Sequence, residues 1–207
     1  LIEDNVELMN IGINIVANDS FSLPLFGNID VRVYWGDGEI DTYTTPGIKT
    51  HQYLYGGNYN LSMFGLVEQF GNGTDGYPNA DKIVSVSSFG DLGLGLTLIS
   101  LKGAFKDAIN LVSIPETIPA SVTNLESMFY GASSLNDSNI LMWDMANITN
   151  ISYMFFNASS FNKNIFLWNI PINSNVNKKF VLYGATAFNQ VISGWLTDEL
   201  EHLANHS

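Results

Sequence analysis

A ten-residue segment rich in small and aromatic residues occurs three times in the second half of the chain. The copies are residues 127–136, 153–162 and 180–189, and a more degenerate copy lies at 104–111. Each copy has an alanine at the same place, in steps of 24, 26 and 27 residues: Ala108, Ala132, Ala158 and Ala185. Repeats of this length bury their apolar faces only against neighbouring repeats. The sequence therefore predicts a solenoid in this half.

Each repeat opens with polar residues that suit the start of a helix. Thr and Asn are favoured helix N-caps, and apolar residues follow them at helical spacing. The openings are Thr123-Asn124, Thr149-Asn150 and Asn177. We therefore expect one or two helical turns in each repeat, ended by a small pair such as Gly131-Ala132.

The repeat period also predicts columns of like side chains. Leu135, Phe161 and Phe188 would form an apolar column, and beside it Asn136, Asn162 and Asn189 would form a hydrogen-bonding column. A tryptophan closes each repeat: Trp143, Trp168 and Trp195. Met and aromatic residues at a fixed repeat period are typical of a core rather than a cofactor site.

The first 80 residues read differently. Apolar residues alternate with polar ones in short segments such as 9–15, 21–25 and 31–35, and Gly and Pro separate these segments. This pattern is typical of the short strands of a β-sandwich. The segment 70–81 is dense in Gly, Asn and Asp, so we expect a linker there.

Composition excludes several kinds of site and partner. A net charge of −12 with only 8 Lys and Arg argues against nucleic acid, because phosphate binding needs clustered cations. The absence of Cys excludes disulfides and thiolate metal sites. No apolar run approaches the roughly 20 residues of a transmembrane segment. Because the chain starts at Leu1 rather than Met, we expect a processed protein or a fragment.

Candidate chemistry is sparse. Asp37, Glu39 and Asp41 alternate along a predicted hairpin and are candidate oxygen ligands of a calcium ion; alternatively they are solvated surface carboxylates. The three histidines do not have metal-ligand spacing, and no phosphate-binding glycine motif is present. We therefore expect no enzymatic activity, no catalytic residue and no cofactor.

The N-terminal motifs resemble a known domain family. They are Trp35-Gly36-Asp37-Gly38, then His51-x-Tyr53, then Gly57-x-Tyr59-x-Leu61. They look like the polycystic-kidney-disease (PKD) domain, an immunoglobulin-like β-sandwich found mostly outside cells. The resemblance implies that these Trp, Asp, His and Tyr residues are mainly structural.

The repeats resemble the BspA-like leucine-rich-repeat surface proteins. Residues 111–115, 121–125 and 154–162 carry this resemblance, and the phrase at 21–25 is also typical there. Such proteins commonly begin with a PKD-like module. The resemblance implies two domains, a PKD-like β-sandwich at 1–80 and a leucine-rich-repeat-like solenoid at 81–207. The repeats of the solenoid would lie near 96–122, 123–148, 149–176 and 177–203.

The predicted fold class is thus mainly β, an Ig/PKD-like β-sandwich followed by a short solenoid with short helical turns. Leu196, Leu200 and Leu203 lie at i, i+4 and i+7, which predicts a C-terminal capping helix. Such a helix would cover the otherwise open core of the last repeat.

The predicted function is adhesion or binding by a non-enzymatic protein displayed outside the cell or on its surface. Its partner would be a protein or glycan on another surface, or copies of itself in an assembly. The predicted contact surface lies near Trp143, Trp168 and Trp195. The alternative is an architectural subunit of a surface layer, a filament or a virion surface.

Overall fold

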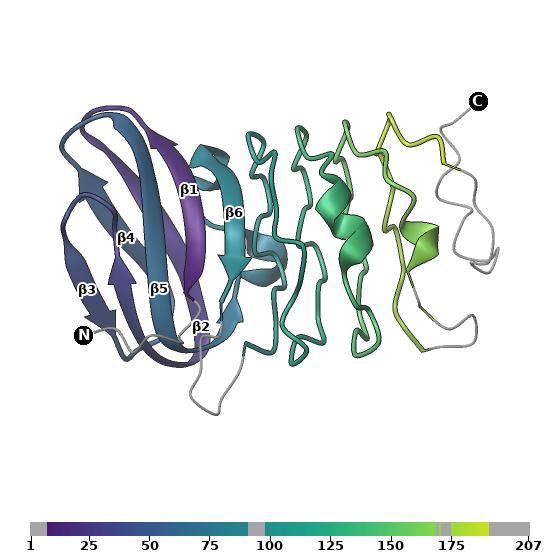
Figure 1. Ribbon diagram of the computed structural model, residues 1–207, viewed down its shortest axis with the longest axis horizontal. Coiled ribbons are helices and arrows are strands. Elements are labelled where there is room, and N and C mark those ends of the chain that lie inside the picture. The colour runs from purple at the N-terminus through teal and green to yellow at the C-terminus, as the bar shows by residue number, and fades with distance from the viewer. Residues whose placement is uncertain (1–7, 91–97, 169, 171–174, 191–207) are drawn as a thin grey trace.

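A computed structural model describes residues 8–90, 98–168, 170 and 175–190. A β-sheet occupies the N-terminal end of the molecule, and turns of chain are stacked beside it along the longest axis (Figure 1). The described chain is therefore mainly β, and its short helices are all of the 3₁₀ type.

Six antiparallel strands form the sheet. They are β1 (Met9–Ile15), β2 (Asp19–Tyr34), β3 (Ile40–Tyr43), β4 (Gly47–Tyr53), β5 (Gly57–Phe70) and β6 (Ile83–Phe89). The order is β3-β2-β5-β1-β6, and β4 also pairs with β2. The alternation that predicted β1 is confirmed, because Met9, Ile11, Ile13 and Ile15 are all buried.

Strand β2 joins two segments that the sequence predicted as separate strands. A bulge between Phe26 and Ile29 interrupts its register with β5. Gly27 adopts a left-handed φ of 74°, which glycine tolerates without steric cost. One carboxylate oxygen of Glu68 accepts hydrogen bonds from the backbone N–H and the side-chain amide of Asn28, at 2.9 Å and 3.0 Å. These contacts hold the bend and keep the strand continuous.

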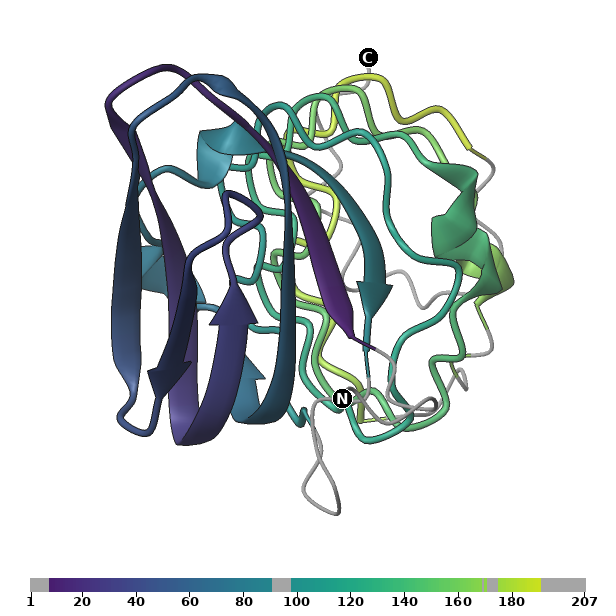
Figure 2. The same cartoon turned by 60° about the vertical axis from the view of Figure 1, so that its left-hand side comes forward.

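The bend folds β2 back on itself. Phe21 lies opposite His51 in the β2–β4 pair, whereas Trp35 follows the other end of β2. A straight strand would separate Phe21 from Trp35 by about 46 Å. The rings of His51 and Trp35 nevertheless stack with centroids 4.7 Å apart. One sheet therefore encloses its own core, and its curvature is visible in Figure 2.

The predicted architecture was wrong. A β-sandwich requires two sheets, but β1 to β6 belong to one open sheet because β2 is continuous across the bend. The leucine-rich-repeat-like solenoid with short helical turns is not formed either, because the described repeats contain turns and only the 3₁₀ helices η3 (Ser138–Met142) and η4 (Ile165–Leu167). The predicted capping helix with Leu196, Leu200 and Leu203 lies outside the described residues.

Four nine-residue segments, which we call tiers, replace the expected helical turns. They are tier 1 (100–108), tier 2 (124–132), tier 3 (150–158) and tier 4 (177–185), with positions numbered 1 to 9. Single parallel bridges join their first residues, Ser100, Asn124, Asn150 and Asn177. The N–H groups at positions 2, 4, 6 and 8 donate to carbonyl groups of the next tier, as in Leu125 to Asn150 at 2.8 Å.

Backbone conformation explains why the tiers are not helical. Positions 4 and 8 are left-handed in every tier, with φ between 54° and 74°. Their residues are Gly103, Ser127, Tyr153 and Phe180 at position 4, and Asp107, Gly131, Asn157 and Gly184 at position 8. A left-handed residue at every fourth place breaks an α-helix. The Asn side chains expected as helix caps instead close turns, since Asn150 Oδ1 accepts the Ser152 N–H at 2.9 Å.

Aromatic rings form a continuous column inside the stack. Phe70 at the end of β5 is followed by Phe105, Phe129 and Phe155 at position 6, with centroids 5.9, 5.8 and 5.7 Å apart. All four side chains are fully buried. The stack therefore extends a core that begins in the sheet.

Both columns predicted from the repeat period are confirmed. The apolar column of Leu135, Phe161 and Phe188 is buried. In the polar column, Asn136 Oδ1 accepts the Asn162 N–H at 2.9 Å, and Asn162 Oδ1 accepts the Asn189 N–H at 3.1 Å.

The segment predicted as a linker packs between the sheet and tier 1. Phe70 N–H donates to the Ser100 carbonyl at 3.0 Å, and Gly73 N–H donates to the Lys102 carbonyl at 3.1 Å. The hydroxyl of Tyr77 donates to the Ala104 carbonyl at 2.6 Å. Strand β6, which the sequence assigned to the second domain, pairs with β1 of the sheet. One buried apolar cluster therefore runs through both parts.

Candidate binding surface

The tryptophans predicted as a contact surface serve the core instead. Trp143 and Trp168 are only 3% and 4% exposed. Their indole N–H groups donate to the carbonyls of Pro115 at 2.9 Å and Ile140 at 2.8 Å, so their polar atoms are satisfied inside the stack. A surface ligand does not reach these rings. Trp195 lies outside the described residues.

Two of the three predicted calcium ligands are engaged with separate partners. Asp41 Oδ2 accepts hydrogen bonds from the Trp35 indole N–H at 2.8 Å and from the Tyr43 hydroxyl at 3.0 Å. Asp37 contacts His51 instead, and Glu39 is exposed. Within the described residues, no group of three His, Cys, Asp or Glu side chains is arranged to hold a metal ion.

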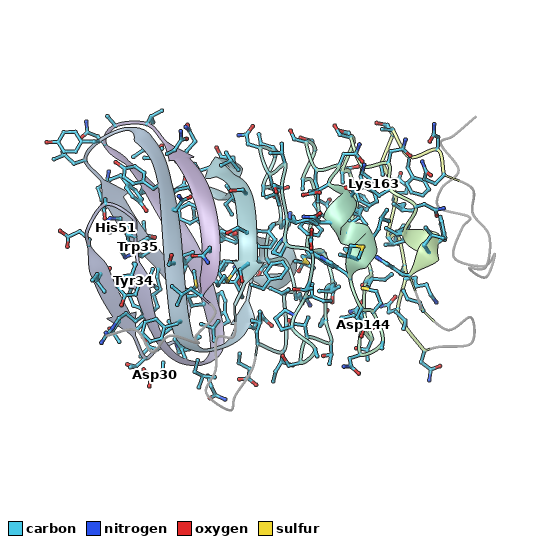
Figure 3. The ribbon with its side chains drawn as sticks, viewed as in Figure 1. Asp30, Tyr34, Trp35, His51, Asp144 and Lys163 are labelled. Carbon is cyan, nitrogen blue, oxygen red and sulfur yellow. The ribbon has the colours of Figure 1, made fainter. Side chains whose placement is uncertain are left out.

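Strands β2 and β4 bring together a network around Trp35. His51 Nε2 lies 2.7 Å from Asp37 Oδ2, and the Tyr53 hydroxyl donates to the Trp35 carbonyl at 2.9 Å. Trp35 and His51 lie side by side within the bent sheet (Figure 3). The packing and hydrogen bonds of this network fix the end of the β2 hairpin, which is a structural role.

Three groups of this network have shifted pKa values, and burial raises the pKa of Tyr53. Burial opposes ionisation of Asp37, but its hydrogen bonds with His51 and the Glu39 N–H outweigh burial, so the pKa of Asp37 lies below its usual value. Burial, together with the adjacent Asp41 carboxylate, raises the pKa of Tyr43 to about 12. These shifts favour the hydrogen-bonded forms seen in the structure.

Five aromatic side chains form a strip on the outside of the tiers. We call Tyr130, Tyr153, Phe156, Phe180 and Tyr183 the aromatic strip. At position 7, the ring of Phe156 stacks between Tyr130 at 4.7 Å and Tyr183 at 4.9 Å. At position 4, Tyr153 and Phe180 stack at 5.2 Å. All five side chains are partly exposed, in contrast to the buried position-6 rings.

Repeat register creates the strip. Residues at one position lie directly over each other because Asn124, Asn150 and Asn177 are bridged in parallel. The two columns adjoin, since the rings of Tyr153 and Phe156 are 5.9 Å apart. The strip was not predicted, although its aromatic residues recur at a constant offset from the alanine of each repeat. The repeat period predicted a core role for these Tyr and Phe residues, and the predicted contact surface was placed near the tryptophans instead.

Three tyrosine hydroxyls of the strip lack a partner within the described part of the chain. The hydroxyls of Tyr130, Tyr153 and Tyr183 make no hydrogen bond to another described residue. Lys106 holds position 7 of tier 1, and its Nζ lies 4.2 Å from the Tyr130 ring centroid. At the opposite end, Lys179 Nζ lies 5.3 Å from the Phe180 ring centroid. The strip is therefore an aromatic surface with hydroxyl groups and a cation at each end.

Two of the four lysines in the tiers are paired with carboxylates. Lys106 pairs with Asp107 at 2.9 Å, and Lys102 pairs with Glu126 at 3.1 Å. Lys178 and Lys179 of tier 4 form no ion pair with another described residue. The tier 4 end of the strip is therefore locally positive, in contrast to the net charge of −12 for the whole chain.

A second group of exposed apolar side chains is smaller. Met142 at the end of η3 and Leu167 at the end of η4 are 69% and 71% exposed. Each precedes a buried tryptophan, so both occupy the same place in their repeats. Scattered exposed aliphatic residues of this kind are common on folded proteins.

Comparison with known proteins places the repeats in a family. Residues 99–206 match the model of a family described as "Mycoplasma protein of unknown function, DUF285". This range includes all four tiers and the whole aromatic strip. No curated protein and no solved structure matches the chain. Among the described residues, no helix is long and apolar enough to cross a membrane.

Proposed function

This chain belongs to the family of Mycoplasma proteins of unknown function DUF285, and we propose that it is a non-enzymatic binding protein of the cell surface. In this proposal the aromatic strip attaches the protein to a protein or glycan on another surface. The BspA-like sequence motifs of the repeats support a place outside the cell.

The observation that carries the proposal is the partial exposure of five stacked rings across tiers 2 to 4. The inner column at position 6 already supplies the stack with a buried aromatic core. The outer rings are therefore additional to the core, and aromatic residues with a polar tip are enriched at interfaces. Their regular spacing presents the same chemistry several times along one face.

An adhesion assay tests this role. We expect the protein to retain cells or beads on a panel of immobilised matrix proteins and polysaccharides. The double variant Phe156→Ser/Tyr183→Ser should lose most of this retention, because it removes the central and terminal rings of position 7. The matched control is Met142→Ser/Leu167→Ser, which changes two exposed apolar residues outside the strip. Equal retention by both double variants contradicts the proposal.

An architectural subunit is the second candidate function. Strands β3 and β4 pair only with β2 within the described residues, so the sheet has an edge that another copy can extend. Light scattering at increasing protein concentration distinguishes the two roles. Regular particles or filaments favour assembly, and a monomer that retains ligand favours adhesion.

Location is tested separately by immunogold labelling of the native source. The proposal predicts gold particles on the outer envelope of cells. Label confined to the cell interior contradicts both surface roles.

A further inference from the structure

The aromatic strip has features that select one class of ligand, and this inference rests on the proposed function. We infer that the strip binds a proline-rich peptide segment in the polyproline II conformation. Such a segment has three residues per turn, no internal hydrogen bonds and fully exposed carbonyl groups.

Ring orientation argues against recognition by sugar stacking. Tyr130 and Phe156 are within 7° of parallel, and Phe156 and Tyr183 are within 20°. Because these neighbours are stacked at 4.7 Å and 4.9 Å, both faces of Phe156 are covered. The strip therefore offers ring edges rather than open ring faces at the central residue of position 7. Aromatic side chains recognise proline-rich peptides in several unrelated domains.

The spacing of the tiers matches the proposed ligand. Tyr130 and Tyr183 occupy the same position two tiers apart, so their rings are separated by the two stacking distances of 4.7 Å and 4.9 Å. One turn of polyproline II advances by about 9.3 Å. Successive turns of the peptide therefore meet equivalent tyrosines, and one ligand contacts the strip repeatedly in the same manner.

The hydrogen-bond donors of the strip also match the acceptors of a proline-rich peptide. Proline has no N–H, so the backbone of the ligand offers carbonyl acceptors and needs donors. The hydroxyls of Tyr130, Tyr153 and Tyr183 are donors without a partner among the described residues. Their spacing along the strip places a donor near successive turns of the peptide.

The backbone of the tiers argues against an added β-strand. Strand addition needs unpaired backbone groups along an exposed edge. In tiers 2 and 3 the N–H groups at positions 2, 4, 6 and 8 already donate to the next tier, as in Phe129 to Met154 at 2.9 Å. Side chains, not backbone groups, therefore make the contacts, and a polyproline II ligand requires no backbone pairing.

Fluorescence anisotropy with labelled decaproline tests the inference on the intact chain. We expect saturable binding of decaproline and no binding of a Gly-Ser decapeptide of equal length. Tyr130→Phe and Tyr183→Phe remove one hydroxyl each and keep the rings, so each should weaken binding about fivefold. Phe156→Ser should abolish binding, whereas Met142→Ser should leave it unchanged. Circular dichroism establishes that each variant is folded.

The results of these experiments separate the peptide inference from the proposed function. Equal affinity for the two decapeptides, no affinity for decaproline, or unchanged affinity in both Tyr→Phe variants overturns the inference. Binding of cellohexaose or heparin in place of decaproline, with loss in Phe156→Ser, also overturns it but leaves the proposed function standing. Retention of cells or beads by the Phe156→Ser/Tyr183→Ser variant contradicts the proposed function itself.

Discussion

The sheet and the tiers use backbone hydrogen bonds in opposite ways. In the sheet, antiparallel pairing places different residues side by side. For example, the ring centroids of Tyr34 and Phe64 lie 6.2 Å apart. In the tiers, parallel bridges place equivalent residues over each other, so similar side chains recur at one position. Repetition therefore produces both the buried Phe column and the exposed aromatic strip. The sheet has no comparable device for building a periodic surface.

The two regions also differ in what fixes the backbone. The sheet depends on side-chain networks such as that of Trp35, His51 and Asp37, in which each residue has a distinct role. The tiers depend on left-handed residues at positions 4 and 8 and on one Asn or Ser per turn. The following variants test whether these regions nevertheless form one cooperative unit.

Core truncation in either region has the largest expected effect. Phe129→Ala removes a ring that stacks against Phe105 and Phe155, and Phe21→Ala removes a buried ring of β2. Each should lower the free energy of unfolding by about 3–5 kcal/mol. Urea titration monitored by far-ultraviolet circular dichroism measures this loss. If the regions share a core, each variant shifts the entire transition, whereas a shift of only part of the transition shows separate units.

Adding a single methyl group between the sheet and tier 1 should destabilise the protein. Gly71 has a φ of 128°, and a Cβ there would collide with the carbonyl oxygen of Lys102. Gly71→Ala should cost about 2–4 kcal/mol from overpacking and backbone strain together.

Gly38→Ala is the matched control, because Gly38 has a φ of 105° but open space around its Cβ position. The difference in midpoint temperature between the two variants isolates the packing between sheet and tier 1. Equal midpoints would mean that the junction is not closely packed.

Removal of a turn-closing side chain should have a moderate effect. Asn150→Ala leaves the N–H of Ser152 without its acceptor and removes a contact with Glu126, so we expect a loss of about 1–2 kcal/mol. Asn150→Ser should lose less, because Ser100 Oγ accepts the Lys102 N–H at the same place in tier 1. Chemical denaturation ranks the three proteins, and a larger loss for the Ser variant contradicts this role.

Lowering the pH should have the smallest effect on stability, through Asp37 of the network around Trp35. The pKa of Asp37 is lower in the folded state than in the unfolded chain, so its contribution is complete above pH of about 4 and is lost at lower pH. Because Asp37 is partly exposed, we expect less than about 1 kcal/mol.

Urea titrations at pH 6 and pH 3 measure this contribution. Asp37→Asn should reduce the difference between the two pH values, and Asp30→Asn, at an exposed position of β2, should not. If Asp37→Asn leaves the difference in the free energy of unfolding between pH 6 and pH 3 unchanged, Asp37 does not contribute to the acid sensitivity.

Local patterns predicted local structure well. Alternation located β1, and the alanine spacing located the repeats and the buried column of Leu135, Phe161 and Phe188. The Asn ladder at Asn136 and Asn162 also followed from spacing alone. These features depend on periodicity, which a single sequence contains.

The architecture could not be predicted in the same way. Gly27-Asn28 looked like a break between strands because the contact with Glu68, 40 residues later in the chain, is invisible in local sequence. The Thr-Asn openings looked like helix caps because an Asn side chain closes a turn and caps a helix through the same hydrogen bond. Partial exposure of the strip depends on which side of each tier faces the solvent, and the repeat spacing does not encode that.

Calorimetric unfolding of the intact chain tests most directly whether the sheet and the tiers are one body with a shared core. The buried cluster from Met9 to Phe188 predicts a single transition. Its calorimetric enthalpy should equal the van't Hoff enthalpy. Two resolved transitions, with Phe129→Ala moving one and Phe21→Ala moving the other, would show that the sheet and the tiers unfold as separate units.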